Sequence, residues 1–225
     1  MIITIDGPTA SGKSTVARKI AQEEGFFYIA SGILFRALGH LLIKEYDYAP
    51  TAVDHATEQE IKELLVSPQF KYVYNNSGEH VIFKGAEITH ALKNSDIDSA
   101  ASILGTNMDA RHALLDFQRN LALNHSVIII DGRDCGSVVF PHADFKFFLT
   151  ASLEVRAKRW QSLQKNLGHN MSLDEAQTFI ASRDKRDSER CIAPLIIPEG
   201  AIFIDSSDMD QQKVISQILE KLVVK

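Results

Sequence analysis

A glycine-rich segment near the start of the chain has the residue spacing of a phosphate-binding loop. It contains the pattern G-x-x-x-x-G-K-S and reads Gly7-Pro8-Thr9-Ala10-Ser11-Gly12-Lys13-Ser14-Thr15. Glycines let backbone amides approach anionic oxygens, and the N-terminus of a following helix adds favourable amides and a dipole. We expect Lys13 to reach the β- and γ-phosphates of a bound nucleotide and the Ser14 hydroxyl to bind Mg²⁺. The alternative is a glycine-rich turn with an exposed lysine, but the apolar run before it and the amphipathic pattern after it favour phosphate binding.

A second polar segment follows the apolar run VIIID at 127–131. Asp131 ends this run, and a carboxylate at the carboxyl end of a buried parallel strand lies near the phosphate loop of a doubly wound sheet. Asp131 is therefore a candidate Mg²⁺ ligand, directly or through water, like a Walker B aspartate. The alternative role is to cap the next element.

Arg133 and Asp134 occupy a glycine-flanked loop directly after this strand. Guanidinium groups suit phosphate, and carboxylates accept hydrogen bonds from amino groups, including the N4 amino group of cytosine. The two side chains could therefore serve one ligand. A structural Arg–Asp pair within the loop is the alternative, and the sequence leaves both open.

A charge-dense run lies further along the chain, between Ala181 and Arg190. Arg183, Asp187 and Arg190 are spaced i, i+4 and i+7, which places them on one face of a helix. A solvated, salt-bridged helix surface is the usual meaning of such a run. The phosphate loop favours a binding role here, because phosphate-bearing substrates need local cations in a net-acidic protein.

A polar, basic stretch runs from Leu153 to Met171 and begins with Arg156, Lys158 and Arg159. Phosphoryl-transfer enzymes place cations on mobile segments, where they stabilise the transferred group and exclude water on closure. We expect a short lid at this place, with a basic helix surface as the alternative.

The elements that must position these residues follow from apolar periodicity. Short apolar runs predict strands at 2–5, 26–30, 127–131, 145–149 and 201–205. Helical spacing predicts helices at 14–24, after Gly32, from about 95 to 124, up to about 190, and at the C-terminus. Residues 70–83 alternate around a turn at 75–78, which indicates an antiparallel hairpin. The pattern predicts an α/β fold: a P-loop NTPase-type parallel sheet flanked by helices, with a small antiparallel β insertion.

The composition of the chain argues against several classes of protein. The 225 residues carry 24 basic and 29 acidic side chains, for a net charge of −5, which argues against a nucleic-acid or membrane-surface protein. Two cysteines, Cys135 and Cys191, are too few and too far apart for a zinc motif or a disulfide framework. The start of the chain does not have the pattern of a signal peptide, and no apolar run reaches 18 residues. We expect a cytoplasmic protein.

Five motifs, taken in order, resemble the bacterial cytidylate kinases. They are IDGPTASGKST, SGILFRAL, DGRDCGSVVFP, FFLTASLEVRAKR and SRDKRDSERCIAPL. The resemblance covers about residues 2–205, and its third and fifth motifs are far more specific than a phosphate loop. It implies ATP-dependent phosphorylation of CMP and dCMP to CDP and dCDP, with ATP and Mg²⁺ as cofactors, by a cytoplasmic monomer. Phosphate attack needs no general base, because the phosphate oxygen is already charged at neutral pH.

The resemblance also implies roles for individual residues. The CMP phosphate would be held by Ser31, Arg36 and Arg133, and the cytosine edge would be read by Ser102, Arg111 and Asp134. The ribose would be positioned by Arg183 and Asp187 with support from Arg190. Lys13, Arg133, Arg156, Arg159 and Arg183 would form the catalytic set.

Several positions depart from the family pattern. The family usually has glycine at position 10, an acidic residue at 30, tyrosine at 35 and arginine at 93 and 160. This chain has Ala10, Ala30, Phe35, Lys93 and Trp160. Lysine and arginine are not interchangeable at bidentate sites, so we expect an active but slower enzyme.

The predicted layout is one P-loop kinase domain over 1–225. Its core would comprise about 1–30, 101–152 and 178–225, its monophosphate-binding region about 31–100, and its lid about 153–177. Two rival functions stay open: a P-loop kinase for another monophosphate or a hydroxyl acceptor, and a GTPase-like switch or nucleotide-binding module. The absence of an N-K-x-D guanine motif from the sequence argues against the switch.

Overall fold

The computed structural model describes residues 1–66 and 68–222. It consists of two compact units. The first contains Met1–Phe26 and the chain from Ile129 onward, and the second contains Phe27–Ile128. Each unit is described by itself.

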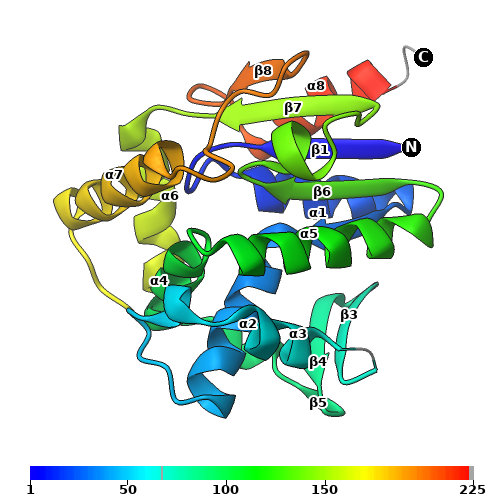
Figure 1. The fold of residues 1–225 in the computed structure, drawn as a ribbon. Helices are drawn as coiled ribbons and strands as arrows, with labels where there is room; N and C mark the ends of the chain where they lie inside the picture. Colours follow the sequence, from blue (N-terminus) through cyan, green and yellow to red (C-terminus); the bar gives the residue numbers. More distant parts are fainter. Residues whose placement is uncertain (67, 223–225) are drawn as a thin grey trace. The chain divides into compact units, whose positions relative to one another are not determined.

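The larger of the two sheets in the described residues is a five-stranded parallel sheet. Its strand order is β2-β6-β1-β7-β8, with β2 Phe27–Ala30, β6 Ile128–Gly132, β1 Ile2–Asp6, β7 Phe145–Thr150 and β8 Ile202–Asp205. Strand β1 pairs in parallel with β7, and β7 pairs in parallel with β8. The predicted strands and the predicted fold class are confirmed (Figure 1). Strand β1 ends at Asp6 and β6 carries Asp131 as its penultimate residue, so both strands have a carboxylate at the carboxyl end.

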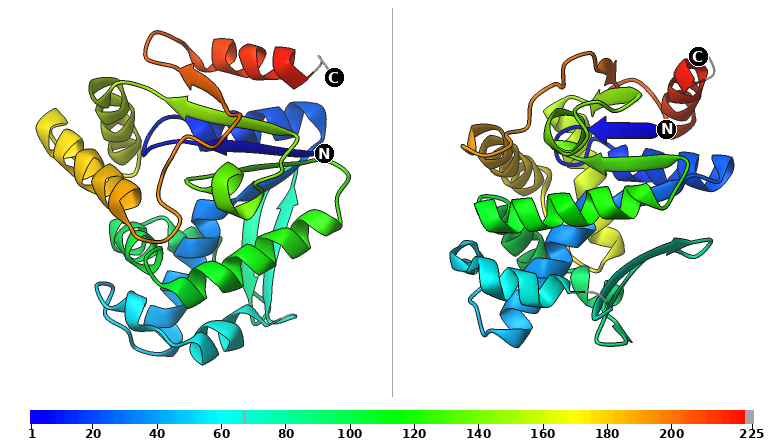
Figure 2. Two further views of the ribbon diagram at one scale, coloured as in Figure 1. Left: turned by 45° about the horizontal axis from the view of Figure 1, so that its top comes forward. Right: turned by 45° about the vertical axis from the view of Figure 1, so that its right-hand side comes forward.

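The helices of the first unit cover the apolar strands. Helix α1 (Lys13–Glu24) contacts α8 (Gln211–Leu222), and Figure 2 shows the two side by side. The side chains of Ile3, Ile5, Phe147 and Leu149 are fully buried beneath these elements. A short π-helix, η3 (Cys135–Val139), follows β6.

The predicted lid segment is helical over most of its length. Helix α6 (Leu153–Asn166) packs against α7 (Leu173–Glu189). Trp160 and Phe179 stack between them, with ring centroids 5.1 Å apart. A capping box of Ser172 and Glu175 begins α7.

The second unit combines helices with the small antiparallel sheet. The predicted hairpin is confirmed as β3 (Phe70–Asn75) and β4 (Gly78–Phe83), to which a two-residue strand, β5 (Ala86–Glu87), is added. The remaining elements are α2 Ser31–Glu45, η1 Val53–His55, α3 Glu58–Leu65, η2 Thr89–Leu92, α4 Ser95–Leu104 and α5 Met108–Leu123. The helical pattern predicted for 95–124 is thus two helices, because Asn107 caps a new helix after Gly105.

In the part of the chain that the structure describes, the helices are too short or too polar to cross a membrane.

The contact between Gly7 and β7 yields a stability prediction. A Cβ at Gly7 would stand 2.0 Å from the backbone carbonyl oxygen of Leu149, whereas a Cβ at Gly32 would meet nothing within 4 Å. We expect Gly7→Ala to lower the free energy of unfolding by about 2 kcal/mol or more, because the strand must shift. The control Gly32→Ala should change it by less than about 1 kcal/mol. Urea unfolding followed by circular dichroism measures both, and equal midpoints would contradict this account.

Candidate active site

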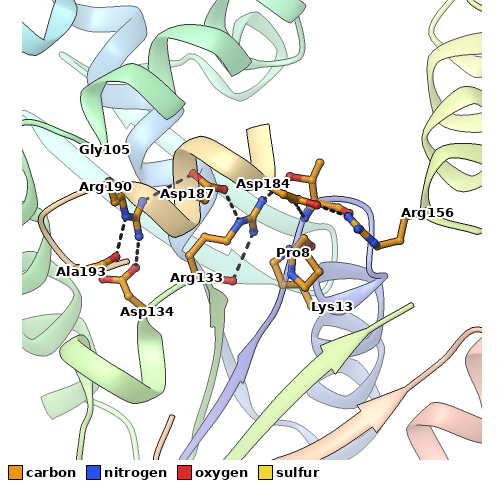
Figure 3. Close-up of polar contacts among 12 residues, drawn as sticks. Pro8, Lys13, Gly105, Arg133, Asp134, Arg156, Asp184, Asp187, Arg190 and Ala193 are labelled. Atoms are coloured by element: carbon orange, nitrogen blue, oxygen red, sulfur yellow. Dashed lines mark hydrogen bonds and ion pairs between the residues drawn. The ribbon is translucent and has the colours of Figure 1, made fainter. Parts of the chain in front are cut away.

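The phosphate loop occupies Gly7 to Gly12, between the end of β1 and the start of α1. Gly12 caps α1 with φ 94°, a left-handed conformation that favours glycine. The Lys13 Nζ atom donates to the carbonyl oxygen of Pro8 at 3.0 Å, so the ammonium group lies over the loop itself (Figure 3). Amides at a helix N-terminus beside a lysine side chain are the groups that an anion site requires, and anion binding at this loop stays a prediction.

Ser14 and Asp131 meet at one point, although 117 positions separate them. The Ser14 hydroxyl donates to Asp131 Oδ2 at 2.6 Å. Two hard oxygen atoms from the protein, next to a phosphate site, are what Mg²⁺ uses when substrate phosphates and waters complete its coordination. These two residues therefore fit the metal role that the sequence predicts for them.

Arg133 and Asp187 form a buried ion pair. The Arg133 Nε atom donates to Asp187 Oδ2 at 2.8 Å, and its Nη2 atom donates to the Thr9 hydroxyl at 3.2 Å. Burial opposes ionisation of Asp187, but the adjacent Arg133, Arg183 and Arg190 outweigh it and lower the pKa of that carboxyl group. Figure 3 shows Arg133 reaching between α7 and the phosphate loop.

Asp134 pairs with a residue that immediately follows α7. Arg190 Nη2 lies 3.5 Å from Asp134 Oδ1, and Arg190 Nη1 lies 3.8 Å from Asp187 Oδ1. Arg190 Nε also donates to the Ala193 carbonyl at 2.7 Å. The carboxylate that pairs with Arg133 is thus Asp187 on α7, and Asp134 pairs with Arg190, which directly follows that helix. The face of α7 that carries Asp187 is buried, which differs from a solvated helix surface.

Arg156 connects α6 to the phosphate loop through hydrogen bonds. Its Nε atom donates to the Ala151 carbonyl at 2.9 Å, and its Nη1 atom donates to the Thr9 carbonyl at 3.0 Å and forms an ion pair with Asp184. Asp184 in turn accepts the Thr9 amide hydrogen at 2.9 Å. Sequence reasoning missed Asp184, although it directly follows Arg183 in a repeated Arg-Asp pattern.

Arg159 contacts the loop one helical turn further along. It donates to the Ser11 carbonyl at 3.1 Å, to the Ser206 hydroxyl at 3.0 Å and to the Ser206 carbonyl at 2.8 Å. Lys158 instead pairs with Glu154 on the exposed side of α6. Two of the three cations that the sequence placed at this lid therefore face the loop.

Asp6 supports the loop that carries Arg133 and Asp134. Its carboxylate accepts the amide hydrogens of Cys135 at 2.8 Å and Gly136 at 2.7 Å. Burial raises the pKa of Asp6 to about 6, although these two amides oppose the rise. Sequence reasoning missed this role, although the signal was present: Asp6 follows the apolar run 2–5 as Asp131 follows the apolar residues 127–130.

In the second unit, four predicted acceptor residues lie on three helices. Ser31 begins α2, and its hydroxyl oxygen accepts a hydrogen bond from Gln118 Nε2 of α5 at 3.2 Å. Arg36 of α2 forms an ion pair with Asp98 of α4 through its Nε atom. Neither Gln118 nor Asp98 stood out in the sequence, because single polar residues within helical patterns carry no motif.

The two predicted cytosine-edge residues of this unit are nearly buried. Ser102 on α4 and Arg111 on α5 are each 7% exposed. Arg111 donates to the Gly105 carbonyl at 3.1 Å, and its guanidinium lies 5.5 Å from the centre of the Phe35 ring. A phenylalanine at position 35 therefore still supplies the ring face that a cation–π contact requires.

These features define a class. The class is that of the P-loop phosphotransferases. Its typical features are present here: a parallel sheet with a phosphate loop at the N-terminus of α1, a Ser–Asp oxygen pair, and arginines bridged by carboxylates. Comparison with known proteins assigns the family: residues 3–223 match the model of the cytidylate kinase family, and the chain belongs to it.

Individual relatives agree with this assignment. The chain is 37% identical to a cytidylate kinase of Caldanaerobacter subterraneus subsp. tengcongensis, over 98% of this chain and 93% of that protein. It is 35% identical to a cytidylate kinase of Bacillus subtilis, over 97% and 94% of the two chains. A crystal structure of an uncharacterized protein from Eubacterium ventriosum shares the fold with a TM-score of 0.54 at 13% identity, covering 100% of this chain and 99% of that one.

The environment of Lys13 generates a prediction about protons. Burial, followed by repulsion from Arg133, lowers the pKa of Lys13 to about 7. Above pH 7 the free protein therefore holds a largely neutral Lys13, and triphosphate binding should return the proton because the anion favours the ammonium form. We expect uptake of close to one proton per Mg²⁺-nucleotide bound at pH 8, and much less at pH 6.

Isothermal titration calorimetry in two buffers of different ionisation enthalpy measures this uptake. Lys13→Met should abolish the buffer dependence, whereas the control Lys158→Met, which removes an exposed lysine, should retain it. The same buffer dependence in Lys13→Met as in the unmodified protein would show that another group takes up the proton.

Proposed function

We propose that this protein transfers the γ-phosphoryl group of ATP to CMP and dCMP, forming CDP and dCDP. The observation that carries the proposal is the match to the cytidylate kinase family over residues 3–223, nearly the whole chain. The local grouping of phosphate-binding cations in a net-acidic protein supports it, because a kinase must neutralise two phosphate-bearing substrates.

The donor side of the proposed reaction uses the phosphate loop. Gly7 to Thr15 would bind the ATP phosphates, with Lys13 on the β- and γ-phosphates. Ser14 and Asp131 would hold Mg²⁺, which, when bound, neutralises charge on the β- and γ-oxygens. The hydrogen bond between Ser14 and Asp131 supports this role, because it brings both oxygens to one point.

Nine residues are proposed for the acceptor side. We assign phosphate binding to Ser31, Arg36 and Arg133. We assign recognition of the cytosine edge to Ser102, Arg111 and Asp134, and positioning of the ribose to Arg183 and Asp187 with support from Arg190. The low exposure of Ser102, Arg111, Asp134 and Asp187 supports these assignments, since polar groups held in desolvated surroundings discriminate strongly between ligands.

The chemistry is in-line attack by a charged phosphate oxygen, so the protein needs no general base. Its work is positioning and charge stabilisation. Lys13, Arg133 and Arg183 would stabilise the transferred group from the core, and Arg156 and Arg159 would do so from α6. The contacts of Arg156 and Arg159 with the loop carbonyls support this role.

We further propose that the protein acts as a cytoplasmic monomer on small-molecule substrates. Both cysteines are free thiols, Cys135 buried and Cys191 exposed, which supports a reducing compartment.

A panel of acceptors tests the proposed reaction. ADP release from Mg²⁺-ATP should be rapid with CMP and dCMP, slower with UMP, and at background level with AMP or without acceptor. Turnover with a different acceptor would overturn the roles of Ser102, Arg111 and Asp134. Turnover that needs no acceptor would indicate an ATPase or a switch instead.

Substitution of the proposed cations should separate chemistry from folding. We expect Lys13→Ala and Arg183→Ala each to lower kcat with CMP by about a hundredfold or more, the loss typical of one group that stabilises transition-state charge. Both variants should keep the far-UV circular dichroism of the unmodified protein. The control Lys158→Ala removes an exposed cation of α6 and should leave kcat unchanged. A fully active Lys13→Ala variant would refute the phosphate-loop assignment.

A further inference from the structure

Gln118 is a buried amide with an unusual hydrogen-bond inventory. It lies on α5 with 1% of its surface exposed, and its Nε2 atom donates to the Ser31 hydroxyl oxygen at 3.2 Å. Its Oε1 atom has no hydrogen-bond partner among the residues that the structure describes. The side chain therefore makes one polar contact, with the first residue of α2.

A buried carbonyl without a partner destabilises a fold, because it loses its hydrogen bonds to water. Leucine at position 118 would fill a similar volume without this cost. Residues that break the rule that buried polar atoms have hydrogen-bond partners are expected at functional sites, where function requires the contact that they make. The contact that Gln118 makes is with Ser31, a residue to which we assign the acceptor phosphate.

The direction of this hydrogen bond determines what Ser31 can do. A hydroxyl group has one proton to donate and two lone pairs that accept. Because the Ser31 oxygen accepts from Gln118, its own proton is available for a second partner that is purely an acceptor. A phosphate oxygen is such a partner, and hydrogen bonds to charged acceptors are among the stronger ones.

The backbone next to Ser31 is held as well. The Ala30 amide donates to the Tyr72 hydroxyl at 3.0 Å, and the Tyr72 hydroxyl donates to the Tyr28 carbonyl at 3.0 Å. Tyr72 is 6% exposed and comes from β3 of the small antiparallel sheet. Tyr72 thus fixes the main chain that leads into α2, and Gln118 fixes the side chain at its first residue.

We propose that Gln118 is a positioning residue that orients the Ser31 hydroxyl toward the phosphate of the nucleoside monophosphate acceptor. The inference rests on the proposed function, since it requires that Ser31 binds this phosphate. It predicts that the amide contributes to acceptor binding while it detracts from stability.

Steady-state kinetics and thermal unfolding of the whole protein test this role. We expect Gln118→Leu to raise the KM for CMP about tenfold, as the loss of one charged hydrogen bond does. The KM for ATP should stay unchanged, and the unfolding midpoint should be equal or higher. Gln118→Glu should raise the KM for CMP further, because a carboxylate only accepts: it would capture the Ser31 proton and add charge near the phosphate. The control Asn120→Ala, on the exposed side of the same helix, should leave both KM values and the unfolding midpoint unchanged.

A double-mutant cycle shows whether Gln118 acts through Ser31. In a Ser31→Ala background, Gln118→Leu should have no further effect on the KM for CMP. Independent effects of the two substitutions would overturn the proposal. A lower unfolding midpoint in Gln118→Leu with an unchanged KM for CMP would do the same, since it would reveal a purely structural amide. If Gln118→Glu had the same kinetics as the unmodified protein, the hydrogen bond would run from Ser31 to residue 118, and the proposal would again be overturned.

Different results would refute the proposed function and the role of Gln118. An unmodified protein without CMP or dCMP turnover refutes the proposed function and this role with it. An active protein whose Gln118 variants keep the KM for CMP refutes only the role of Gln118.

Discussion

Cations that are gathered to bind phosphate repel one another before any phosphate arrives, and this repulsion constrains the first unit. Lys13 shows part of this effect: burial, and after it repulsion from the nearby Arg133, lower the pKa of its ammonium group to about 7. Asp187 relieves the repulsion by pairing with Arg133 at 2.8 Å. The carboxylates are therefore as necessary to the site as the cations, and they explain how a chain of net charge −5 can hold a local anion site.

The same carboxylates determine geometry. Asp184 and Asp187 stand one turn apart on α7, and they hold Arg156 of α6 and Arg133 of the loop after β6, respectively. Asp184 also accepts the Thr9 amide hydrogen, so one helix positions two arginines and the phosphate loop together. Buried ion pairs contribute little net stability, because desolvation offsets their attraction. Their value in this unit is that each guanidinium has one defined place.

Sequence predicted the parts of this arrangement whose signal is local. The phosphate loop, the strand that ends at Asp131 and the hairpin at 70–83 each have a pattern that backbone sterics or apolar periodicity dictates. The partners of the arginines could not be predicted in this way. Asp184 and Asp98 contact residues 28 and 62 positions away, and only the folded chain brings them together. Periodicity places a residue on a helix face but does not say what that face meets.

Two departures from the family pattern, Ala10 and Trp160, lie in the same packed region. Ala10 has φ 58°, a left-handed conformation that costs a residue with a Cβ about 1–2 kcal/mol. Its methyl group packs against the buried cluster of Ala157, Trp160, Ala176 and Ile180. Ala10 is only partly buried, so its methyl group gains at most about 0.8 kcal/mol from burial, which offsets part of the strain. Trp160, at a position where the family usually has arginine, belongs to the cluster that the methyl packs against. In this chain apolar packing therefore joins the phosphate loop to α6 and α7, in addition to the ion pair of Arg156 and Asp184. The residues at positions 10 and 160 should for this reason be considered together, and not as the separate loss of a glycine and of a cation.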